Sequence, residues 1–308
     1  MGKIAALGEV LFDSFEGKEI IGGAPFNFIY HINALNNIHN LGFSPFLISK
    51  VGKDERGKKV LSFFSEHQLE NKYLQVAPEI STGVVEVTVN SLGIPEYEIV
   101  ENAAYDYIEF DGATRELIMK DVSLFYFGTL FQRTASNRLT LSNCLPDETI
   151  HEKKVFFDIN LRQNYYSWEI IDNSLLYADY LKLNLDEIEV LKYKFFPDKK
   201  SLTYEEFIHF LIKEYILSAL ILTKGDKGAE IFDNNENRWN HKGKSCPDIK
   251  DSVGAGDGFS AIFCLGILLR WPMNMILNRA IDFSCEICRI EGAIPKELTW
   301  YNQFKVWF

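Results

Sequence analysis

The sequence predicts an α/β protein whose central sheet is mainly parallel and carries helices on both faces. Short apolar, β-rich runs recur along the chain, separated by segments long enough to form helices. Most of these runs do not alternate between polar and apolar residues, which is typical of strands that are covered on both faces. The predicted strands span residues 3–8, 46–52, 123–128, 154–160, 179–184 and 219–225.

Length and composition are those of a globular chain with a sizeable core. The 308 residues, 47% of them hydrophobic, need neither disulfides nor metal ions to fold. A formal net charge of −11 argues against a nucleic-acid partner. The uncharged run over 258–269 is shorter than the roughly 18 residues that suggest a membrane span. We therefore expect one domain over residues 1–308, soluble and cytoplasmic, with no membrane partner.

The five cysteines are expected to be free thiols in a reducing compartment, because their number is odd and most have apolar neighbours. Cys285 and Cys288 form a C-x-x-C pair. No second pair or nearby histidine completes a zinc site, so the pair is expected to be two small core residues on one helix face.

One region departs from the pattern of buried strands. Residues 82–90 and 93–110 read as strands of alternating polarity joined by a Gly-Ile-Pro turn, so one face of their sheet is covered and one is wet. Together with residues 14–20, the region 82–110 is expected to form a small β-sheet lid over a ligand site. Tyr97, Tyr105 and Tyr107 favour a lid over a plain edge hairpin, because they offer contact surface. Such a lid could pair with that of a second subunit in a homodimer.

The segment DSVGAGDGF, from Asp251, places three small residues and one carboxylate before an apolar run of helical length. Gly254, Ala255 and Gly256 carry little bulk, so their backbone N–H groups could approach a ligand directly. A helix N-terminus has unsatisfied donors and partial positive charge, which suit an anion such as phosphate. The dipole also favours the ionised form of Asp257, which could act as a base or serve as an ordinary helix cap.

The segment IIGGAPFNF, from Ile20, places a glycine pair before a second helix. Gly22 and Gly23 permit close backbone approach, and Pro25 suits the first turn of a helix. Asn27 supplies both donors and acceptors, as a polyol requires. By itself, however, the segment favours a plain glycine turn.

Polar residues also follow three of the predicted strands, where ligands of parallel α/β sheets bind. After residues 154–158, Asn160 and Arg162 follow at alternate positions. Arg162 could grip a phosphate or a sugar hydroxyl, or it could form a structural ion pair with Asp158.

Asn184 and Glu187 follow the strand 179–184, and the carboxylate could hold hydrated magnesium or simply complement the helix dipole. Thr223 ends a further strand, and Gly225 and Gly228 in the next turn could pass beneath a nucleotide. Two glycines in a turn are weak support by themselves.

Taken together, these segments resemble the ribokinase-like carbohydrate kinases, and within them the fructokinase-like group. GGAPFN and DSVGAGDGF occur in the family's order, with FGTLFQR, FDINLRQNYYS, KLNLDEIE and TKGDKG between them. The GGxxxN and DxxGAGD motifs at this separation are highly specific. No G-x-x-x-x-G-K-[ST], G-x-S-x-G or H-E-x-x-H motif occurs, so P-loop, hydrolase and zinc-protease chemistries lack their residues.

The resemblance implies a ribokinase-like three-layer α/β/α domain with a small β-sheet lid. It also implies ATP-dependent phosphorylation of a primary hydroxyl of a ketohexose, D-fructose above all, with Mg²⁺. K⁺ is a further candidate, because relatives often bind a monovalent cation near the positions of Asp251 and Ser252. Alternative functions are phosphorylation of another sugar or a nucleoside, and non-catalytic sugar sensing.

Individual residue roles are implied by the same resemblance. Asp257 is implied to be the catalytic base, in an anion hole formed with Gly254, Ala255 and Gly256. The implied sugar-binding positions are Asp13, Gly22, Gly23 and Asn27, with Asn160 and Arg162 at the floor of the site. The implied nucleotide and metal positions are Asn184, Thr223, Gly225 and Gly228, with Glu187 at the magnesium. Phe26 departs from the family, where fructokinases more often carry a small residue, and is expected to alter packing beneath the sugar.

Overall fold

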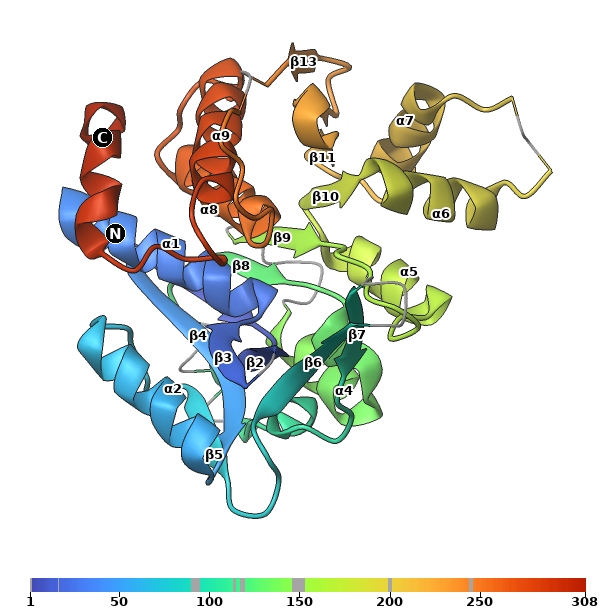
Figure 1. The fold of residues 1–308 in the computed structure, drawn as a ribbon. Coiled ribbons are helices and arrows are strands. Elements are labelled where there is room, and N and C mark those ends of the chain that lie inside the picture. Colours follow the sequence, from blue (N-terminus) through green and yellow to red (C-terminus); the bar gives the residue numbers. More distant parts are fainter. Residues whose placement is uncertain are drawn as a thin grey trace.

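The structure is a computed structural model that describes residues 2–15, 17–89, 95–112, 115–116, 120–145, 153–198, 201–243 and 246–308. Within these ranges the chain forms a nine-stranded sheet, a four-stranded sheet, and helices on both faces of the larger sheet (Figure 1). The predicted three-layer α/β architecture is confirmed.

The large sheet has the strand order β13-β12-β11-β10-β9-β8-β1-β4-β5. All neighbours from β5 to β11 are parallel, and β12 and β13 add an antiparallel edge. Each of the six apolar runs predicted as strands lies in the parallel part. The strands are β1 (Lys3–Leu7), β4 (Ser44–Gly52), β5 (Leu74–Ala77), β8 (Val122–Phe127), β9 (Lys154–Asp158), β10 (Tyr180–Asn184), β11 (Ala219–Thr223), β12 (Ala229–Asp233) and β13 (Arg238–His241).

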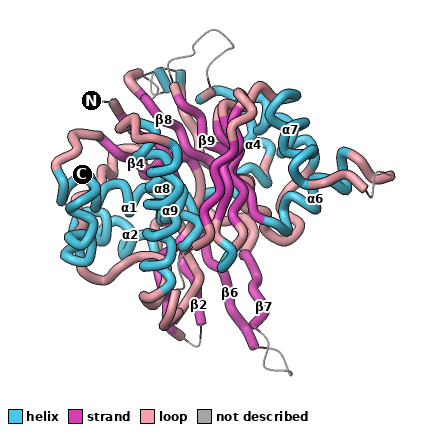
Figure 2. Tube along the Cα trace, turned by 90° about the horizontal axis from the view of Figure 1, so that it is seen from above, coloured by secondary structure: helices cyan, strands magenta, loops and turns pink. Residues whose placement is uncertain are grey.

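Helices cover both faces of this sheet, as Figure 2 shows. One face carries α1 (Ala24–His39), α2 (Glu55–Glu66), α8 (Ala255–Leu268) and α9 (Met273–Cys288). The other carries α4 (Ala135–Cys144), α5 (Trp168–Tyr177), α6 (Leu185–Phe195) and α7 (Tyr204–Glu214). Short 3₁₀ helices are η1 (Ala104–Tyr107), η2 (Leu130–Arg133), η3 (Gly225–Lys227) and η4 (Leu298–Trp307).

Each central strand therefore contributes side chains to two hydrophobic clusters, one on each face of the sheet. In β8, Leu124 and Tyr126 pack into the cluster beneath α1, α8 and α9, whereas Phe125 and Phe127 pack into the opposite cluster. The ring of Tyr126 stacks on Phe28 of α1 with ring centroids 4.0 Å apart. Burial on both faces explains why these strands read as continuous apolar runs.

The small sheet has the order β3-β2-β6-β7, formed by β2 (Leu11–Phe15), β3 (Lys18–Gly22), β6 (Gly83–Val89) and β7 (Pro95–Ile99). Its first hairpin is longer than the predicted 14–20. Its last strand ends at Ile99, and Ala104–Tyr107 form η1 instead of continuing the strand predicted to reach residue 110. The predicted Gly-Ile-Pro turn lies partly outside the described residues.

The prediction that all cysteines are free thiols is wrong. Cys246 and Cys285 form a disulfide, with Cα atoms 5.7 Å apart. The segment before Asp251 runs back along the end of α9, where the N–H groups of Lys250 and Asp251 both donate to the Cys288 carbonyl. This return path, which local sequence does not reveal, brings the two cysteines together. Cys144, Cys264 and Cys288 carry free thiols, and the last is only half-buried.

Among the described residues, no helix is both long enough and apolar enough to cross a membrane.

Helix α8 is anchored by an aromatic contact that can be tested. The ring centroid of Phe263 lies 5.6 Å from that of Phe156 in β9 and 5.5 Å from that of Tyr180 in β10. Phe263→Ala is expected to lower the free energy of unfolding by about 3–5 kcal/mol, because it leaves a cavity between helix and sheet. Guanidinium denaturation measures the change. Leu139→Ala, at a 63% exposed position, is the control and should stay within about 0.5 kcal/mol. Similar small losses in both variants would contradict this anchoring.

Candidate active site

A cavity of about 770 Å³ lies between the large sheet, the small sheet and the N-termini of α1 and α8. Its walls include residues at the carboxyl ends of β9 and β10, the segment 160–163, and part of the small sheet. Ligands of parallel α/β sheets bind at such strand ends, so the position matches the expectation for this fold class.

The structure brings most of the predicted site residues to this one cavity. Ala255, Gly225 and Gly228 are not among the residues that line it: Ala255 begins α8, and the two glycines shape the η3 turn beyond Thr223. The predicted residues that do line it are Asp13, Gly22, Gly23, Asn27, Asn160, Arg162, Asn184, Glu187, Thr223, Gly254, Gly256 and Asp257.

The N-terminus of α8 opens onto the cavity because Gly254 adopts a left-handed conformation, with φ of 77°. A side chain at this position would also overlap Ala293. Glycine is therefore required both by the backbone angle and by the close approach. The Ala255 N–H donates to the Ser252 carbonyl at 3.3 Å. Gly256, one residue further along the first turn, lines the cavity, where first-turn N–H groups suit an anion.

The Asp257 carboxylate sits in this first turn and is only 9% exposed. Its Oδ2 accepts a hydrogen bond of 2.8 Å from Asn27 Nδ2 in the first turn of α1. Burial raises the pKa of Asp257 from 3.8 to about 6, and the Asn27 amide and the Lys182 ammonium oppose this rise. A carboxylate with this pKa is ionised at neutral pH and can still accept a proton.

Asn27 also presents a free acceptor. Its Oδ1 is buried and has no hydrogen-bond partner within the described part of the chain. Because an unpaired buried carbonyl is costly, this atom is suited to receive a hydroxyl donor from a ligand.

Two further carboxyl groups line the same cavity. Glu9, which follows β1, is 5% exposed, and burial raises its pKa from 4.5 to about 7, against the N–H groups of Glu9 and Ala24 and the charge of Arg162. Burial also raises the pKa of Asp13 in β2, again opposed by Arg162. The floor of the cavity is therefore rich in oxygen acceptors, which suit the hydroxyl groups of a polyol.

The positive charge of the cavity comes from Arg162, which is exposed, and from Lys182, which is buried. Arg162 is exposed, and its guanidinium lowers the pKa values of Glu9, Asp13 and Asp257, so it faces this acidic group. The alternative of an Arg162–Asp158 ion pair is wrong, because Asp158 Oδ2 pairs with Lys182 Nζ at 2.6 Å.

Asn184 and Glu187 cap α6 reciprocally. Asn184 Oδ1 accepts from the N–H groups of Asp186 and Glu187 at 2.9 Å each. Glu187 Oε2 accepts from the Asn184 N–H at 2.7 Å and Oε1 from the Leu161 N–H at 2.9 Å. Both carboxylate oxygens are thus engaged by backbone donors, and no group of three or more metal-ligating side chains occurs among the described residues. The pair fits hydrated magnesium, held through water, better than direct coordination.

The small sheet contributes an apolar roof. Leu11, Ile21, Val85 and Ile99 line the cavity from its strands. The expectation that the tyrosines supply contact surface is wrong for Tyr105, which is fully buried under β6.

The structure does not support that expectation for Tyr107 and does not test it for Tyr97. Tyr107 donates to Asn102 Oδ1 at 2.9 Å and is not among the cavity residues. The side chain of Tyr97 lies outside the described residues.

Phe26 is also absent from the cavity lining and packs into the core against Phe63 and Phe64, so it does not lie under a ligand.

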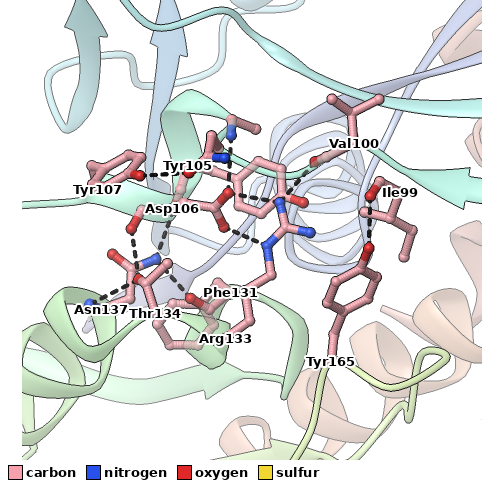
Figure 3. Close-up of polar contacts among 12 residues, drawn as sticks. Ile99, Val100, Tyr105, Asp106, Tyr107, Phe131, Arg133, Thr134, Asn137 and Tyr165 are labelled. Carbon is pink, nitrogen blue, oxygen red and sulfur yellow. Dashed lines mark hydrogen bonds and ion pairs between the residues drawn. The ribbon is translucent and has the colours of Figure 1, made fainter.

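Arg133 of η2 connects the residue after β7 of the small sheet to η1, as Figure 3 shows. Its guanidinium makes two hydrogen bonds of 2.6 Å to the Asp106 carboxylate and one of 2.8 Å to the Val100 carbonyl. Tyr165, in the loop that carries Arg162, donates to the carbonyl of Ile99 at 3.0 Å. The end of β7 and the loop after β9 are thereby held against each other, each contributing residues to the cavity.

The family model described as "pfkB family carbohydrate kinase" matches residues 17–300 of this chain. The chain belongs to the pfkB family of carbohydrate kinases. It is therefore a phosphotransferase with an alcohol group as acceptor.

Relatives of this pfkB-family kinase have different named substrates. An ATP-dependent 6-phosphofructokinase of Thermoanaerobacterium thermosaccharolyticum is 26% identical over 287 residues, covering 90% of this chain and 81% of that protein. "Probable fructokinase-6, chloroplastic" of Arabidopsis thaliana is 25% identical, covering 92% and 74%. A solved structure from E. coli, described as "a putative Ribokinase II in complex with ATP and Mg+2", superposes with a TM-score of 0.78 at 19% identity over 100% of both chains. The last comparison establishes the fold.

Glu9 and Lys182 line the kinase cavity but are absent from the predicted site. A signal for both exists in the sequence, since Glu9 is the single charge in "IAALGEVLF" and Lys182 is the single charge in "YLKL". A charge is rarely buried without a partner or a function, so such interruptions deserve a functional interpretation.

Burial of Glu9 predicts a pH-dependent stability. Its pKa is about 7 in the folded chain and 4.5 as the ordinary value, so between these pH values the folded state binds more protons than the unfolded state. The free energy of unfolding therefore falls as pH rises through this window, by up to about 3 kcal/mol. Glu9→Gln removes this titration and should be more stable than the parent at pH 8, with a much smaller difference at pH 5.

Urea denaturation at both pH values measures the effect. Glu86→Gln, at an exposed position of β6, is the control and should show no such pH dependence. Equal effects of Glu9→Gln at pH 5 and pH 8 would contradict a buried, proton-binding Glu9.

Proposed function

We propose that this chain transfers the γ-phosphoryl group of ATP to a primary hydroxyl of a ketohexose, with D-fructose as the preferred acceptor. One observation carries the proposal: Asp257 is buried at the N-terminus of α8, in a cavity lined with sugar-compatible acceptors, and is held by Asn27 at 2.8 Å. A base and an anion-binding helix end thus face the same space.

In the proposed reaction the acceptor hydroxyl lies beside Asp257, which takes its proton as the oxygen attacks the γ-phosphorus. The bond between that phosphorus and the β,γ-bridging oxygen of ATP breaks, and ADP leaves. The first-turn N–H groups of α8 and the Arg162 guanidinium stabilise the charge on the transferred group, which is the main demand of phosphoryl transfer. Closure of the small sheet as a lid would exclude water from the cavity.

ATP and magnesium are proposed as cosubstrate and cofactor. The related E. coli structure contains both, and Asn184 with Glu187 fits a hydrated ion. When bound, magnesium would neutralise part of the charge of the phosphate groups. Thr223, with Gly225 and Gly228 in the following turn, is proposed to lie at the nucleotide.

An uncharged acceptor is favoured over a phosphosugar. A second phosphate would need its own cationic partners, and residues 82–110 contain neither Lys nor Arg. Among the described residues that line the cavity the cationic side chains are Arg162 and Lys182, which leaves no separate cationic group for a second phosphate beside the transferred one. Glu9 and Asp13 would repel a second phosphate. Monovalent-cation binding near Asp251, dimerisation through the small sheet and a cytoplasmic location stay predictions.

An ADP-release assay tests the proposal directly. We expect ADP production with D-fructose in the presence of Mg²⁺, and much less with fructose 6-phosphate, aldohexoses or nucleosides. Running the panel with and without K⁺ tests the monovalent cation. Release with fructose 6-phosphate alone would overturn the acceptor, and no release with any sugar would favour a sensing role.

Asp257→Asn should fold normally and retain most of its affinity for fructose, because the side-chain shape and the contact with Asn27 are preserved. Its kcat should fall by about 10²–10⁴-fold, the usual contribution of a positioned general base. Steady-state kinetics and calorimetric fructose binding measure the two quantities. Near-normal turnover would show that Asp257 is not the base.

The pH profile gives an independent check on the same group. Since the Asp257 pKa is about 6 and the base must be ionised, kcat/KM should be level above pH 7. Below pH 6 it should fall about tenfold per pH unit. The acid limb should persist in Glu9→Gln, which separates the two buried carboxyl groups. A kcat/KM that stays constant down to pH 5 would contradict the assignment.

A further inference from the structure

Lys182 places a positively charged ammonium group in the interior of the large sheet. It lies in β10 between Leu181 and Leu183, which are buried in the core cluster beneath the helices α4 to α7. Its own side chain points away from that cluster, is 8% exposed and lines the cavity. A buried lysine is rare unless it is paired or has a functional role.

Asp158 holds the ammonium in place. Asp158 Oδ2 lies 2.6 Å from Lys182 Nζ, 3.0 Å from Ser260 Oγ in α8 and 3.2 Å from the hydroxyl of Tyr126 in β8. The carboxylate is thus fixed from three elements. Ser260 Oγ is also 3.0 Å from the Gly256 carbonyl, which ties this group to the first turn of α8.

The ammonium lies beside the proposed anion hole. A Cβ built on Gly256 would be 3.4 Å from Lys182 Nζ, so the ammonium lies next to the first turn of α8. Because Gly256 has no side chain, the space between them stays free. The charge of Lys182 also lowers the pKa values of both Asp257 and Glu187, so it acts on the proposed base and on the proposed magnesium-positioning pair. An ammonium has three donors, and Asp158 is the one carboxylate with which it pairs among the described residues.

We propose that Lys182 is a catalytic residue that donates a hydrogen bond to the phosphoryl group during transfer, with Asp158 as its positioning residue. This inference rests on the proposed kinase function. Lys182 stays protonated throughout: the proton of the acceptor hydroxyl goes to Asp257, one P–O bond forms and one breaks, and the ammonium supplies only charge and a donor. The γ-phosphoryl group is its partner, so Lys182 should matter for ATP more than for ADP.

The competing explanation is a purely structural ion pair, and a double variant separates the two. Lys182→Met leaves Asp158 buried without its partner, so this single variant should lose stability under either explanation. Combining Lys182→Met with Asp158→Asn removes both charges and should restore most of the lost melting temperature. A structural pair predicts that activity returns with stability. The proposed role predicts that it does not.

The experiment combines thermal unfolding, kinetics and calorimetric titration with MgATP and MgADP on the full chain. The double variant is expected to melt near the parent, to lose about 10²-fold or more in kcat, and to lose more affinity for ATP than for ADP. Lys192→Met is the matched control. This lysine of α6 pairs with Glu189 and is not a cavity residue, so its kcat and its ratio of ATP to ADP affinity should match the parent.

Recovery of parental kcat in the double variant, or equal losses of ATP and ADP affinity, would overturn the inference. If the double variant does not fold, Lys182→Gln with Asp158→Asn replaces it, because the two amides can hydrogen-bond to each other. Absence of sugar-dependent ADP release in the parent would instead refute the proposed function. In that case the ratio of ATP to ADP affinity alone decides whether Lys182 contacts the γ-phosphoryl group.

Discussion

The burial of one carboxylate at a helix N-terminus is the constraint on which the rest of this structure depends. Asp257 loses hydration in the first turn of α8 and is compensated by the helix end, the Asn27 amide and nearby cations. Gly254 must be glycine so that the turn can form. The apolar body of α8, locked between the sheet and α9, fixes the direction in which the carboxylate points.

The same cavity is lined by more negative than positive side chains, and these charged groups differ in their burial. Glu9 and Asp257 are buried and their pKa values are raised, Arg162 is exposed at the edge, and Lys182 is buried but paired with Asp158. The apolar roof of the small sheet keeps the carboxyl groups poorly hydrated. These charges are the basis of the proposal that the cavity takes a neutral polyol beside its carboxyl groups and an anion at the helix N-terminus.

Sequence alone predicts the parallel sheet and the gathering of most motif residues at one cavity, because buried strands and helix-start glycines have local signatures. Tyr105 shows the limit: alternation predicts a strand, but tertiary packing under β6 turns the segment into η1 and buries the ring. The Cys246–Cys285 disulfide depends on a chain path that no spacing reveals. Lys182 and Glu9 are visible as charges in apolar runs, yet their partners, distant in sequence, appear only in three dimensions.

A crystal structure with D-fructose and a non-hydrolysable ATP analogue tests most directly whether Asp257 and the α8 N-terminus act together in phosphoryl transfer. We expect a primary hydroxyl oxygen about 2.6–3.2 Å from the Asp257 carboxylate, with the terminal phosphate against the first turn of α8. A sugar bound with its hydroxyl groups remote from Asp257, or a terminal phosphate remote from this helix end, would show that Asp257 is not the base of the transfer.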